Sequence, residues 1–156
     1  LAKSICNNQT KLLHFGGWKK LNNSKVSKEI FNKEVAKKLK ISDQNILDVY
    51  GFSEQLGTIY VSKGFGGCKV SNFSHILIRD PKSLKVVEDG KVGFMQFLSV
   101  LPLSYPGISI LNDDMGYISK RTLDDNVENI EFKVQSRLDK LELRGCGDTL
   151  PDHYYI

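Results

Sequence analysis

The sequence lacks the features that mark a membrane protein, a secreted disulfide scaffold or a structural zinc site. Its 156 residues contain no apolar run near the roughly 18 residues that a membrane span needs. Its three cysteines, Cys6, Cys68 and Cys146, are odd in number and include no CxxC pair, which disfavours disulfides and zinc. The N-terminal segment has no apolar core followed by a signal-peptide cleavage site. These absences predict a protein of the reducing cytoplasm, without a membrane span.

The charged residues do not concentrate in any one segment. The net charge of +4 comes from lysines spread along the chain, which favours weak attraction to anions such as nucleotides. Because no basic patch stands out, we expect no nucleic-acid partner. Hydrophobic residues make up 40% of the chain and charged residues 26%, so the composition is that of an ordinary globular protein with a real core.

The first third of the chain predicts one strand–helix–strand unit. Residues 11–17, "KLLHFGG", form an apolar strand that ends on two glycines, and residues 45–51, "NILDVYG", form a second. Residues 26–40 between them have the period of an amphipathic helix. Its apolar face is expected to hold Phe31, Val35 and Leu39, with Ile30 and Ala36 beside them. Such a unit is usually parallel and right-handed, which places the residues after both strands at the carboxyl edge where open α/β sheets bind ligands.

The rest of the chain predicts antiparallel sheet, so the expected fold class is mixed α/β. Short segments rich in β-branched and aromatic residues are separated by the turn signals "DPKS", "EDGK", "YPG" and "LNDDMG". We expect a βαβ part over residues 1–62, a small barrel-like antiparallel subdomain over 63–135, and a hinge-like segment with a tail over 136–156. A lone βαβ unit has an unpaired outer edge. Either the first strands pair differently, or the chain is a piece of a larger protein, as its start without Met suggests.

One short stretch, "YGFSE", carries chemistry at the end of the second predicted strand. Gly51 permits a tight turn, and the ring of Tyr50 can stack on a planar base. The Ser53 hydroxyl can bond a phosphate, and the Glu54 carboxylate can hold a magnesium ion that also binds substrate phosphates. Taken alone, the same residues also describe a surface turn with a solvated glutamate.

Further segments occur in an order that resembles the adenylate-forming enzymes, which are acyl-CoA ligases, luciferases and related acid-activating synthetases. "YGFSE" resembles their Tyr-Gly-x-(Ser/Thr)-Glu nucleotide motif. Residues 15–19, "FGGWK", resemble their Gly-rich adenine turn, and residues 89–100, "DGKVGFMQFLSV", resemble their Asp-Gly-x-x-Gly strand. "YPGISILNDDMG" resembles the segment with the ribose-binding aspartate, and residues 136–145, "SRLDKLELRG", resemble the interdomain hinge with Ser136 in place of glycine.

The resemblance implies roles for individual residues. Gly16, Gly17 and Trp18 would form the adenine turn, and Asp114 would accept hydrogen bonds from both ribose hydroxyls. Arg137 would reach the ribose or a phosphate from the hinge. The implied nucleotide is ATP, accompanied by Mg²⁺ at Glu54.

Within that superfamily the chain is most similar to the acyl-protein synthetases of the LuxE type, which are fatty acid–protein ligases. "LLHFGGWK", "YGFSEQLGTIY", "LIRDP", "SVLPLSYPG" and "LRGCGDT" all have the character of that branch. The resemblance runs from about Lys11 to Thr149 and matches only the C-terminal part of the family. It implies that a fatty acid is activated as acyl-AMP and that the acyl group then passes to a protein thiol. The superfamily's phosphate loop would lie upstream of Leu1, so we expect the isolated chain to be inactive.

The thiol step requires a cysteine that can form a thiolate. In the LuxE branch the acyl group passes through a cysteine near the C-terminus before it reaches an acceptor such as a fatty acid reductase, and Cys146 matches that position. Glycines on both sides give Cys146 mobility, and Arg144 would lower its pKa while Asp148 would oppose this. Cys68, in the Gly-rich segment "GFGGCK", is the competing candidate.

Two other functions fit part of the sequence. A phenylacetate-type acyl-CoA ligase shares the Tyr-Gly-x-Ser-Glu and hinge motifs, but its acceptor would be CoA. A non-catalytic binding domain of the same fold is the second alternative. Intact Glu54, Asp114 and Arg137 argue against it, because a binding module has no need of polar residues at three nucleotide-contacting positions.

Overall fold

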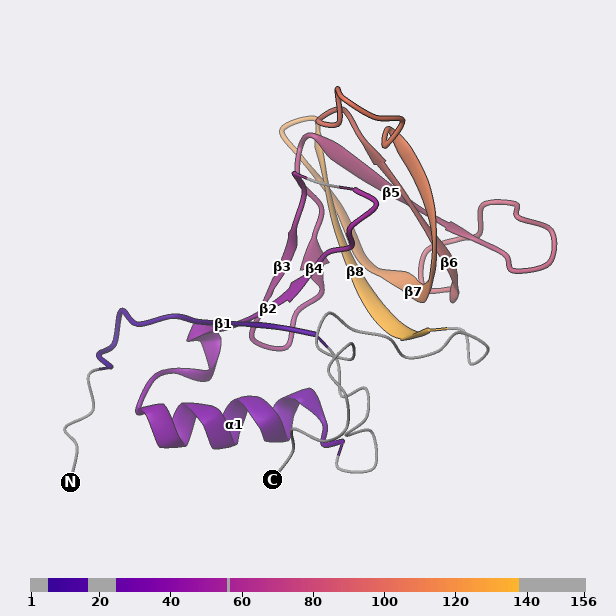
Figure 1. Cartoon of the computed structure of the whole chain (residues 1–156). Coiled ribbons are helices and arrows are strands. Elements are labelled where there is room, and N and C mark those ends of the chain that lie inside the picture. Colours follow the sequence, from indigo (N-terminus) through magenta and orange to yellow (C-terminus); the bar gives the residue numbers. More distant parts are fainter. Residues whose placement is uncertain (1–5, 17–24, 56, 138–156) are drawn as a thin grey trace, which may run out of the picture.

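A computed structural model describes residues 6–16, 25–55 and 57–137 (Figure 1). For residues 136 and 137 it describes the backbone but not the side chains. The described residues form one mixed sheet of eight strands in the order β1-β2-β3-β4-β8-β7-β6-β5. The elements are β1 (Leu12–Phe15), α1 (Lys28–Leu39), a 3-10 helix (Asp43–Asn45), β2 (Ile46–Tyr50), β3 (Tyr60–Lys63), β4 (Cys68–Lys69), β5 (Ser74–Arg79), β6 (Gly93–Ser99), β7 (Ser109–Asp124) and β8 (Val127–Arg137). The mixed α/β fold class is therefore confirmed.

Strand β1, helix α1 and strand β2 form the predicted βαβ unit. Strands β1 and β2 pair in parallel, with Leu12 opposite Ile46 and Phe15 opposite Val49. Every other pairing in the sheet is antiparallel. The sheet runs without a break from the βαβ unit into the antiparallel strands, and β3 crosses the boundary predicted after residue 62. That boundary stays a prediction.

Helix α1 begins and ends at capping residues. The side chain of Ser27 accepts a hydrogen bond from the backbone N–H of Ile30, and Lys40 ends the helix in the left-handed conformation with φ 56°. The buried residues of α1 are Asn32 and Ala36, whereas Ile30 is 54% exposed. Ile30 therefore does not lie on the buried face of the helix, where the sequence predicted it. Ala36 packs with Ile41 and Ile46 beneath the sheet. No helix among the described residues is long and apolar enough to cross a bilayer.

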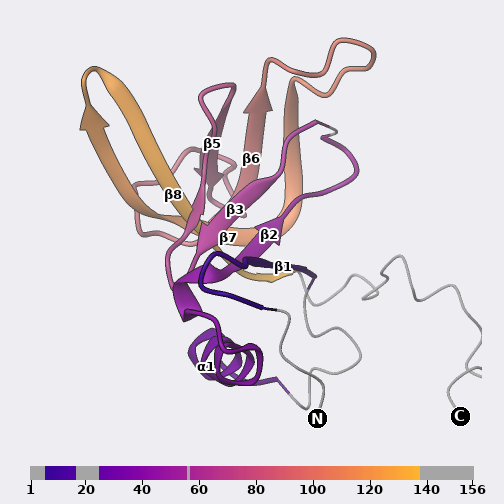
Figure 2. The ribbon, with the colours of Figure 1, turned by 90° about the vertical axis from the view of Figure 1, so that its left-hand side faces the viewer.

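The antiparallel strands curl around a second and larger core (Figure 2). Nine buried residues from β3 to β8 form this cluster: Tyr60, Cys68, Ile76, Ile78, Met95, Phe97, Ile118, Ile130 and Phe132. Strands that lie far apart in the sheet order thus bury side chains against one another, which requires strong twist and coiling. The predicted barrel-like character follows from this shared core.

The segment "LNDDMG" is not a turn, contrary to the sequence prediction. Leu111–Gly116 lie inside β7, which pairs with β6 and β8 and carries a register shift at Met115 and Gly116. Asn112 satisfies its turn propensity locally, because its side-chain oxygen accepts the backbone N–H of Asp114 at 2.9 Å. The chain reverses instead at Asp125 and Asn126, which both have positive φ and form the two-residue loop typical of a type I′ hairpin.

The "DGKVG" segment contributes to stability in two ways. Asp89 accepts hydrogen bonds from Nε and Nη2 of Arg121 at 2.7 and 3.0 Å, and these bonds lower the pKa of Asp89. Gly93 begins β6 with its Cα so close to β5 that an added Cβ would lie 2.2 Å from the backbone oxygen of Arg79. The second glycine of the segment is therefore required by the close approach of two strands.

Replacement of this glycine predicts a measurable loss of stability. Gly93→Ala forces two backbone segments apart, and we expect a loss of about 1–3 kcal/mol, as for other overpacked sites. Urea unfolding of the chain measures this, and Gly51→Ala is the matched control, because a Cβ there meets only ordinary contacts from 3.5 Å outwards. Equal stability of the two variants would show that β5 and β6 do not approach each other this closely.

Candidate functional site

The carboxyl ends of β1 and β2 lie at the same edge of the sheet because the two strands are parallel. Gly16, directly after β1, has φ +87°, a conformation that favours glycine, and nothing lies within 4 Å of where its Cβ would be. This open backbone suits close approach of a ligand. Gly17 and Trp18, the other two residues of the predicted adenine turn, lie outside the described residues.

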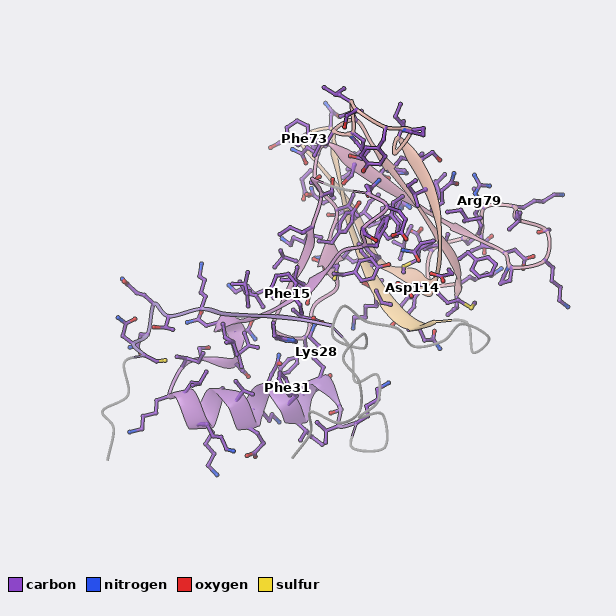
Figure 3. All side chains as sticks on the ribbon, in the orientation of Figure 1. Phe15, Lys28, Phe31, Phe73, Arg79 and Asp114 are labelled. Carbon is purple, nitrogen blue, oxygen red and sulfur yellow. The ribbon has the colours of Figure 1, made fainter. Side chains whose placement is uncertain are left out.

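Two predicted nucleotide-binding residues, 64 positions apart in the sequence, meet in the structure. The hydroxyl of Tyr50, the last residue of β2, donates a hydrogen bond to Oδ2 of Asp114 on β7 at 2.8 Å. Nδ2 of Asn112 donates to the Tyr50 hydroxyl oxygen at 3.1 Å. In Figure 3, Asp114 lies among the antiparallel strands, and Phe15 lies on β1. The sequence prediction missed Asn112 because "LNDD" was taken for a turn, although Asn112 and Asp114 have the two-residue spacing of one strand face.

The ring of Tyr50 is half-buried in an aromatic cluster. Its centroid lies 5.7 Å from that of Phe132, 5.9 Å from Phe97 and 6.0 Å from Phe52. Tyr60, fully buried below it, donates its hydroxyl to Oε1 of Gln55 at 2.8 Å, and burial raises the pKa of Tyr60 to about 12. The cluster therefore fixes the direction in which the Tyr50 hydroxyl points toward Asp114.

The rest of the "YGFSE" motif forms an exposed turn after β2. Gly51, Ser53 and Glu54 are exposed, and Ser53 Oγ donates to Glu54 Oε2 at 3.3 Å. Among the described residues no three His, Cys, Asp or Glu side chains gather as metal ligands. A single exposed carboxylate fits a magnesium ion only when the ion brings phosphate oxygens and water with it, which is the usual way Mg²⁺ binds at nucleotide sites.

The hinge-like segment is described only at its start. In the β7–β8 ladder Arg137 lies directly opposite Asp114, so the two predicted ribose-contacting positions are neighbours across strands. Residues 138–156, including Cys146, lie outside the described part of the chain.

The competing thiol, Cys68, is not in a mobile loop. It lies in β4, is only 7% exposed, and packs in the main core. Burial, with the negative charge of Asp48 as a smaller cause, raises the pKa of the Cys68 thiol to about 12. A thiol with this pKa has almost no thiolate near neutral pH, so Cys68 is poorly suited to act as a nucleophile.

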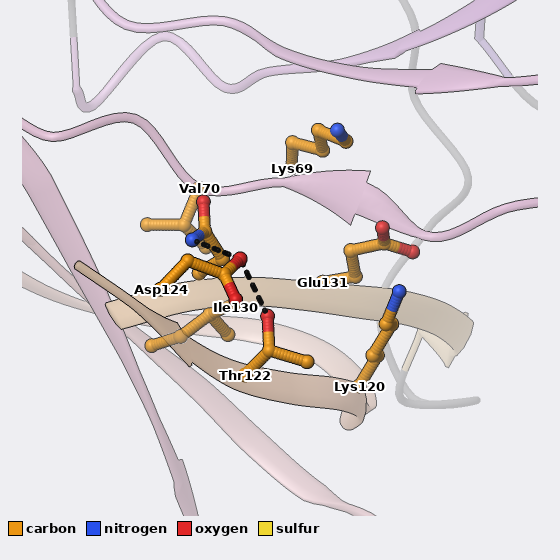
Figure 4. A pocket seen from close by; sticks show the side chains of 8 residues that line it. Lys69, Val70, Lys120, Thr122, Asp124, Ile130 and Glu131 are labelled. Carbon is orange, nitrogen blue, oxygen red and sulfur yellow. Dashed lines mark hydrogen bonds between the residues drawn. The ribbon is translucent and has the colours of Figure 1, made fainter. Parts of the chain in front are cut away.

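A shallow hollow of about 140 Å³ lies between β4 and the β7–β8 hairpin (Figure 4). It is lined by Lys69, Val70, Lys120, Thr122, Asp124, Asn129, Ile130 and Glu131. Asp124 Oδ2 accepts from Asn129 Nδ2 at 3.1 Å and from Thr122 Oγ1 at 3.5 Å, so three of the polar side chains that line the hollow bond one another. None of the predicted site residues lines this hollow.

Comparison with known proteins finds relatives of this chain by sequence and by structure. Over 133 residues the chain is 26% identical to the long-chain-fatty-acid–luciferin-component ligase of Aliivibrio fischeri, covering 85% of the chain and 35% of that protein. Among solved structures, a luciferase-like enzyme of the mealworm Zophobas morio superposes with a TM-score of 0.54 at 18% identity, over 83% of this chain and 32% of that one. The McyG A-PCP structure complexed with phenylalanyl-adenylate also gives a TM-score of 0.54, at 17% identity over 83% of this chain and 25% of that one.

These likenesses agree on the fold. The structural neighbours are adenylate-forming enzymes, and at these identities they establish the fold alone. The chain spans about a third of the length of the curated relative that it matches. The family model for "Acyl-protein synthetase, LuxE" matches residues 4–155, nearly the whole chain. The chain therefore belongs to the LuxE acyl-protein synthetase family.

Proposed function

We propose that this chain is the nucleotide-recognising part of an ATP-dependent ligase that activates a long-chain fatty acid as acyl-AMP and transfers the acyl group to a protein thiol. The observation that carries the proposal is the 2.8 Å hydrogen bond between Tyr50 and Asp114. It joins two separately recognised nucleotide motifs at one place in the fold. Because the chain spans 35% of its relative, the activity is proposed for a protein of the relatives' length, called here the full-length synthetase.

In the proposed site the nucleotide lies over the carboxyl ends of β1 and β2. The open backbone at Gly16 admits the adenine, and the Tyr50 ring faces the base. Asp114 accepts hydrogen bonds from the ribose hydroxyls, and Arg137, opposite it in the ladder, adds positive charge near the ribose or a phosphate. The Ser53 hydroxyl is placed to bond a phosphate, and Glu54 is the carboxylate for the accompanying Mg²⁺.

The first chemical step joins two anions. A fatty acid carboxylate oxygen attacks the α-phosphorus of ATP, a new O–P bond forms, and pyrophosphate leaves with the electrons of the broken bond. The protein lowers the barrier by holding the reactants together and by offsetting their repulsion. A carboxylate in an exposed turn, as Glu54 is, keeps access to a phosphate-bound cation.

The second step needs a thiolate that attacks the acyl carbon, with AMP as the leaving group. Of the three cysteines, Cys68 is unsuited by its burial and raised pKa, and Cys6 precedes the first strand. We therefore assign the acyl-carrier role to Cys146, which the family resemblance also indicates. An acyl-acceptor protein, such as a fatty acid reductase, then receives the acyl group from the thioester.

Loss of the Asp114 carboxylate should weaken nucleotide binding. In the full-length synthetase, Asp114→Ala removes a charge-assisted hydrogen-bond acceptor, for which a loss of about 2 kcal/mol in ATP binding is expected. Equilibrium binding of ATP measures the change, and Asp113→Ala, next to it on the opposite strand face, is the control. Unchanged ATP affinity of Asp114→Ala would remove the ribose role from this residue and with it the proposed site.

Loss of the Glu54 charge should slow activation. Glu54→Gln keeps the size of the side chain but binds Mg²⁺ poorly, so fatty-acid-dependent ATP–pyrophosphate exchange should fall at least about tenfold, or about 1.4 kcal/mol. Glu88→Gln, in an exposed turn of the antiparallel part, should exchange at the wild-type rate. Exchange by Glu54→Gln at that same rate would exclude Glu54 from the mechanism.

Loss of the carrier thiol should separate the two steps. With ATP, Mg²⁺ and a labelled fatty acid, hydroxylamine-sensitive label is expected on the wild-type synthetase, on Cys6→Ser and on Cys68→Ala. Cys146→Ser should carry no label but should still form acyl-AMP. Label that persists on Cys146→Ser would overturn the carrier role, and acyl transfer from that variant to CoA would favour the phenylacetate-type ligase instead.

A further inference from the structure

The turn that carries Ser53 and Glu54 lies in a long connection between two paired strands. Strands β2 and β3 are antiparallel neighbours with Tyr50 opposite Tyr60, and residues 51–59 connect them. Most hairpin connections are only about two to five residues long, so a connection of this length depends on contacts of its own for a defined shape. Among its described residues, Gln55 and Thr58 are the buried ones, with 1% and 6% exposed.

Gln55 is buried although Glu54, its neighbour in the chain, is exposed. Its side-chain Oε1 accepts a hydrogen bond from the Tyr60 hydroxyl at 2.8 Å, and its backbone N–H donates to the carbonyl of Phe52 at 3.3 Å. Its side-chain Nε2 is buried and has no hydrogen-bond partner among the described residues. A buried amide with an unpaired donor lowers stability, so stability alone does not account for a glutamine at this position.

Tyr60 is a well-held donor for this bond. Its ring is fully buried, and its centroid lies 5.1 Å from that of Phe97 and 5.3 Å from that of Phe132. Because burial raises the pKa of Tyr60 to about 12, its hydroxyl keeps its proton throughout the neutral range. Tyr60 is also the direct cross-strand partner of Tyr50, with ring centroids 6.4 Å apart. The residue that anchors the Glu54 turn is therefore the neighbour of the residue that contacts Asp114.

We propose that Gln55 is a positioning residue, which through its bond to Tyr60 holds Glu54 where the carboxylate can reach a phosphate-bound Mg²⁺. The inference rests on the proposed nucleotide site, in which Asp114 binds the ribose and Glu54 the metal. A carboxylate in a long exposed turn adopts many positions unless the turn is anchored, and small misplacements weaken such contacts. The Gln55 bond sets the metal-binding turn and the Tyr50–Asp114 contact on one pair of neighbouring tyrosines.

The first test asks whether Gln55 affects the metal side of the site alone. In the full-length synthetase, Gln55→Met removes the acceptor, and kcat/KM for MgATP in ATP–pyrophosphate exchange should fall about fivefold to tenfold. The affinity for AMP should stay within about twofold, because AMP lacks the β- and γ-phosphates that bring the metal. Gln96→Met is the matched control and should equal the wild type in both. Gln96 on β6 also accepts a side-chain hydrogen bond, from Arg79 Nε.

The second test separates position from stability. Gln55→Met leaves the Tyr60 hydroxyl without the acceptor that Gln55 supplies, and Tyr60→Phe leaves Gln55 Oε1 without its donor, so each variant should unfold at lower urea. The double variant leaves neither group unpaired, and its stability should return toward that of the wild type. Its kcat/KM for MgATP should stay as low as in Gln55→Met, because the positioning bond is still absent. If Gln55→Met is too unstable to assay, the double variant takes its place in the first test.

A third test asks whether Gln55 acts through Glu54. If it does, adding Gln55→Met to Glu54→Gln should lower exchange by less than about a further twofold, because the carboxylate that Gln55 positions is already lost. A full fivefold to tenfold further loss in the Glu54→Gln background would overturn the positioning role.

The outcomes distinguish the role of Gln55 from the site on which it rests. If Glu54→Gln exchanges at the wild-type rate, the metal role of Glu54 is wrong, and the proposed site fails together with the inference. If Glu54→Gln is slow but Gln55→Met equals the wild type, the site stands and the positioning role is overturned. An equal loss of AMP affinity, an equal loss in Gln96→Met, or recovery of kcat/KM together with stability in the double variant would also overturn it, because each indicates only a structural role.

Discussion

The hydrogen bond from the Tyr50 hydroxyl to Asp114 joins the two halves of this structure. Tyr50 ends the parallel βαβ part, and Asp114 lies on the long hairpin of the antiparallel part. A hydroxyl this close to an aromatic core needs a hydrogen-bond partner, since an unpaired polar group there would cost about 1–3 kcal/mol. The rings of Phe97 and Phe132 hold Tyr50 from the core side, so the bond sets the distance between the end of β2 and the middle of β7.

The sheet topology explains why residues distant in sequence share this place. β4 pairs with β8, and this pairing brings the hairpin of β7 and β8 back against the βαβ unit instead of leaving it as a separate layer. Within that hairpin, Asp114 and Arg137 are direct cross-strand partners. The close approach of β7 to β8 depends on Gly116, where a Cβ would lie 2.5 Å from the backbone oxygen of Lys133 on β8 and 2.6 Å from the sulfur of Met95 on β6. Small residues at such crossings allow the compact curl around the aromatic core.

Local patterns predicted the parts of the fold that depend on local physics. The helical period of residues 26–40 and the two flanking apolar runs were enough for the βαβ unit, which the structure confirms. The segment "LNDDMG" was misread because Asn and Asp favour turns when they are considered alone, whereas strand pairing on both sides decided their conformation. The Asn112 contact could not be derived from spacing, because it joins β2 and β7, two strands that lie far apart in the sequence and do not pair in the sheet. Cys68 was placed in a mobile loop because of its neighbouring glycines. Gly67, directly before it, is in fact packed tightly, since a Cβ there would meet Ser119 Oγ at 2.7 Å and the backbone oxygen of Phe132 at 2.8 Å.

The same bond that organises the core is compatible with a ligand at Asp114. An ionised carboxylate has two oxygens and about four lone-pair directions, so it can accept from Tyr50 and from further donors at once. The backbone N–H of Asp114 is already directed to Asn112, and Asn112 in turn donates to Tyr50, so three groups hold one another in a closed arrangement. Preorganisation of this kind lowers the cost of binding, because the acceptor does not have to be ordered when the ligand arrives. A ribose that donates to Asp114 would therefore add to an existing network instead of replacing it, and the aromatic core would keep its geometry whether or not the nucleotide is bound.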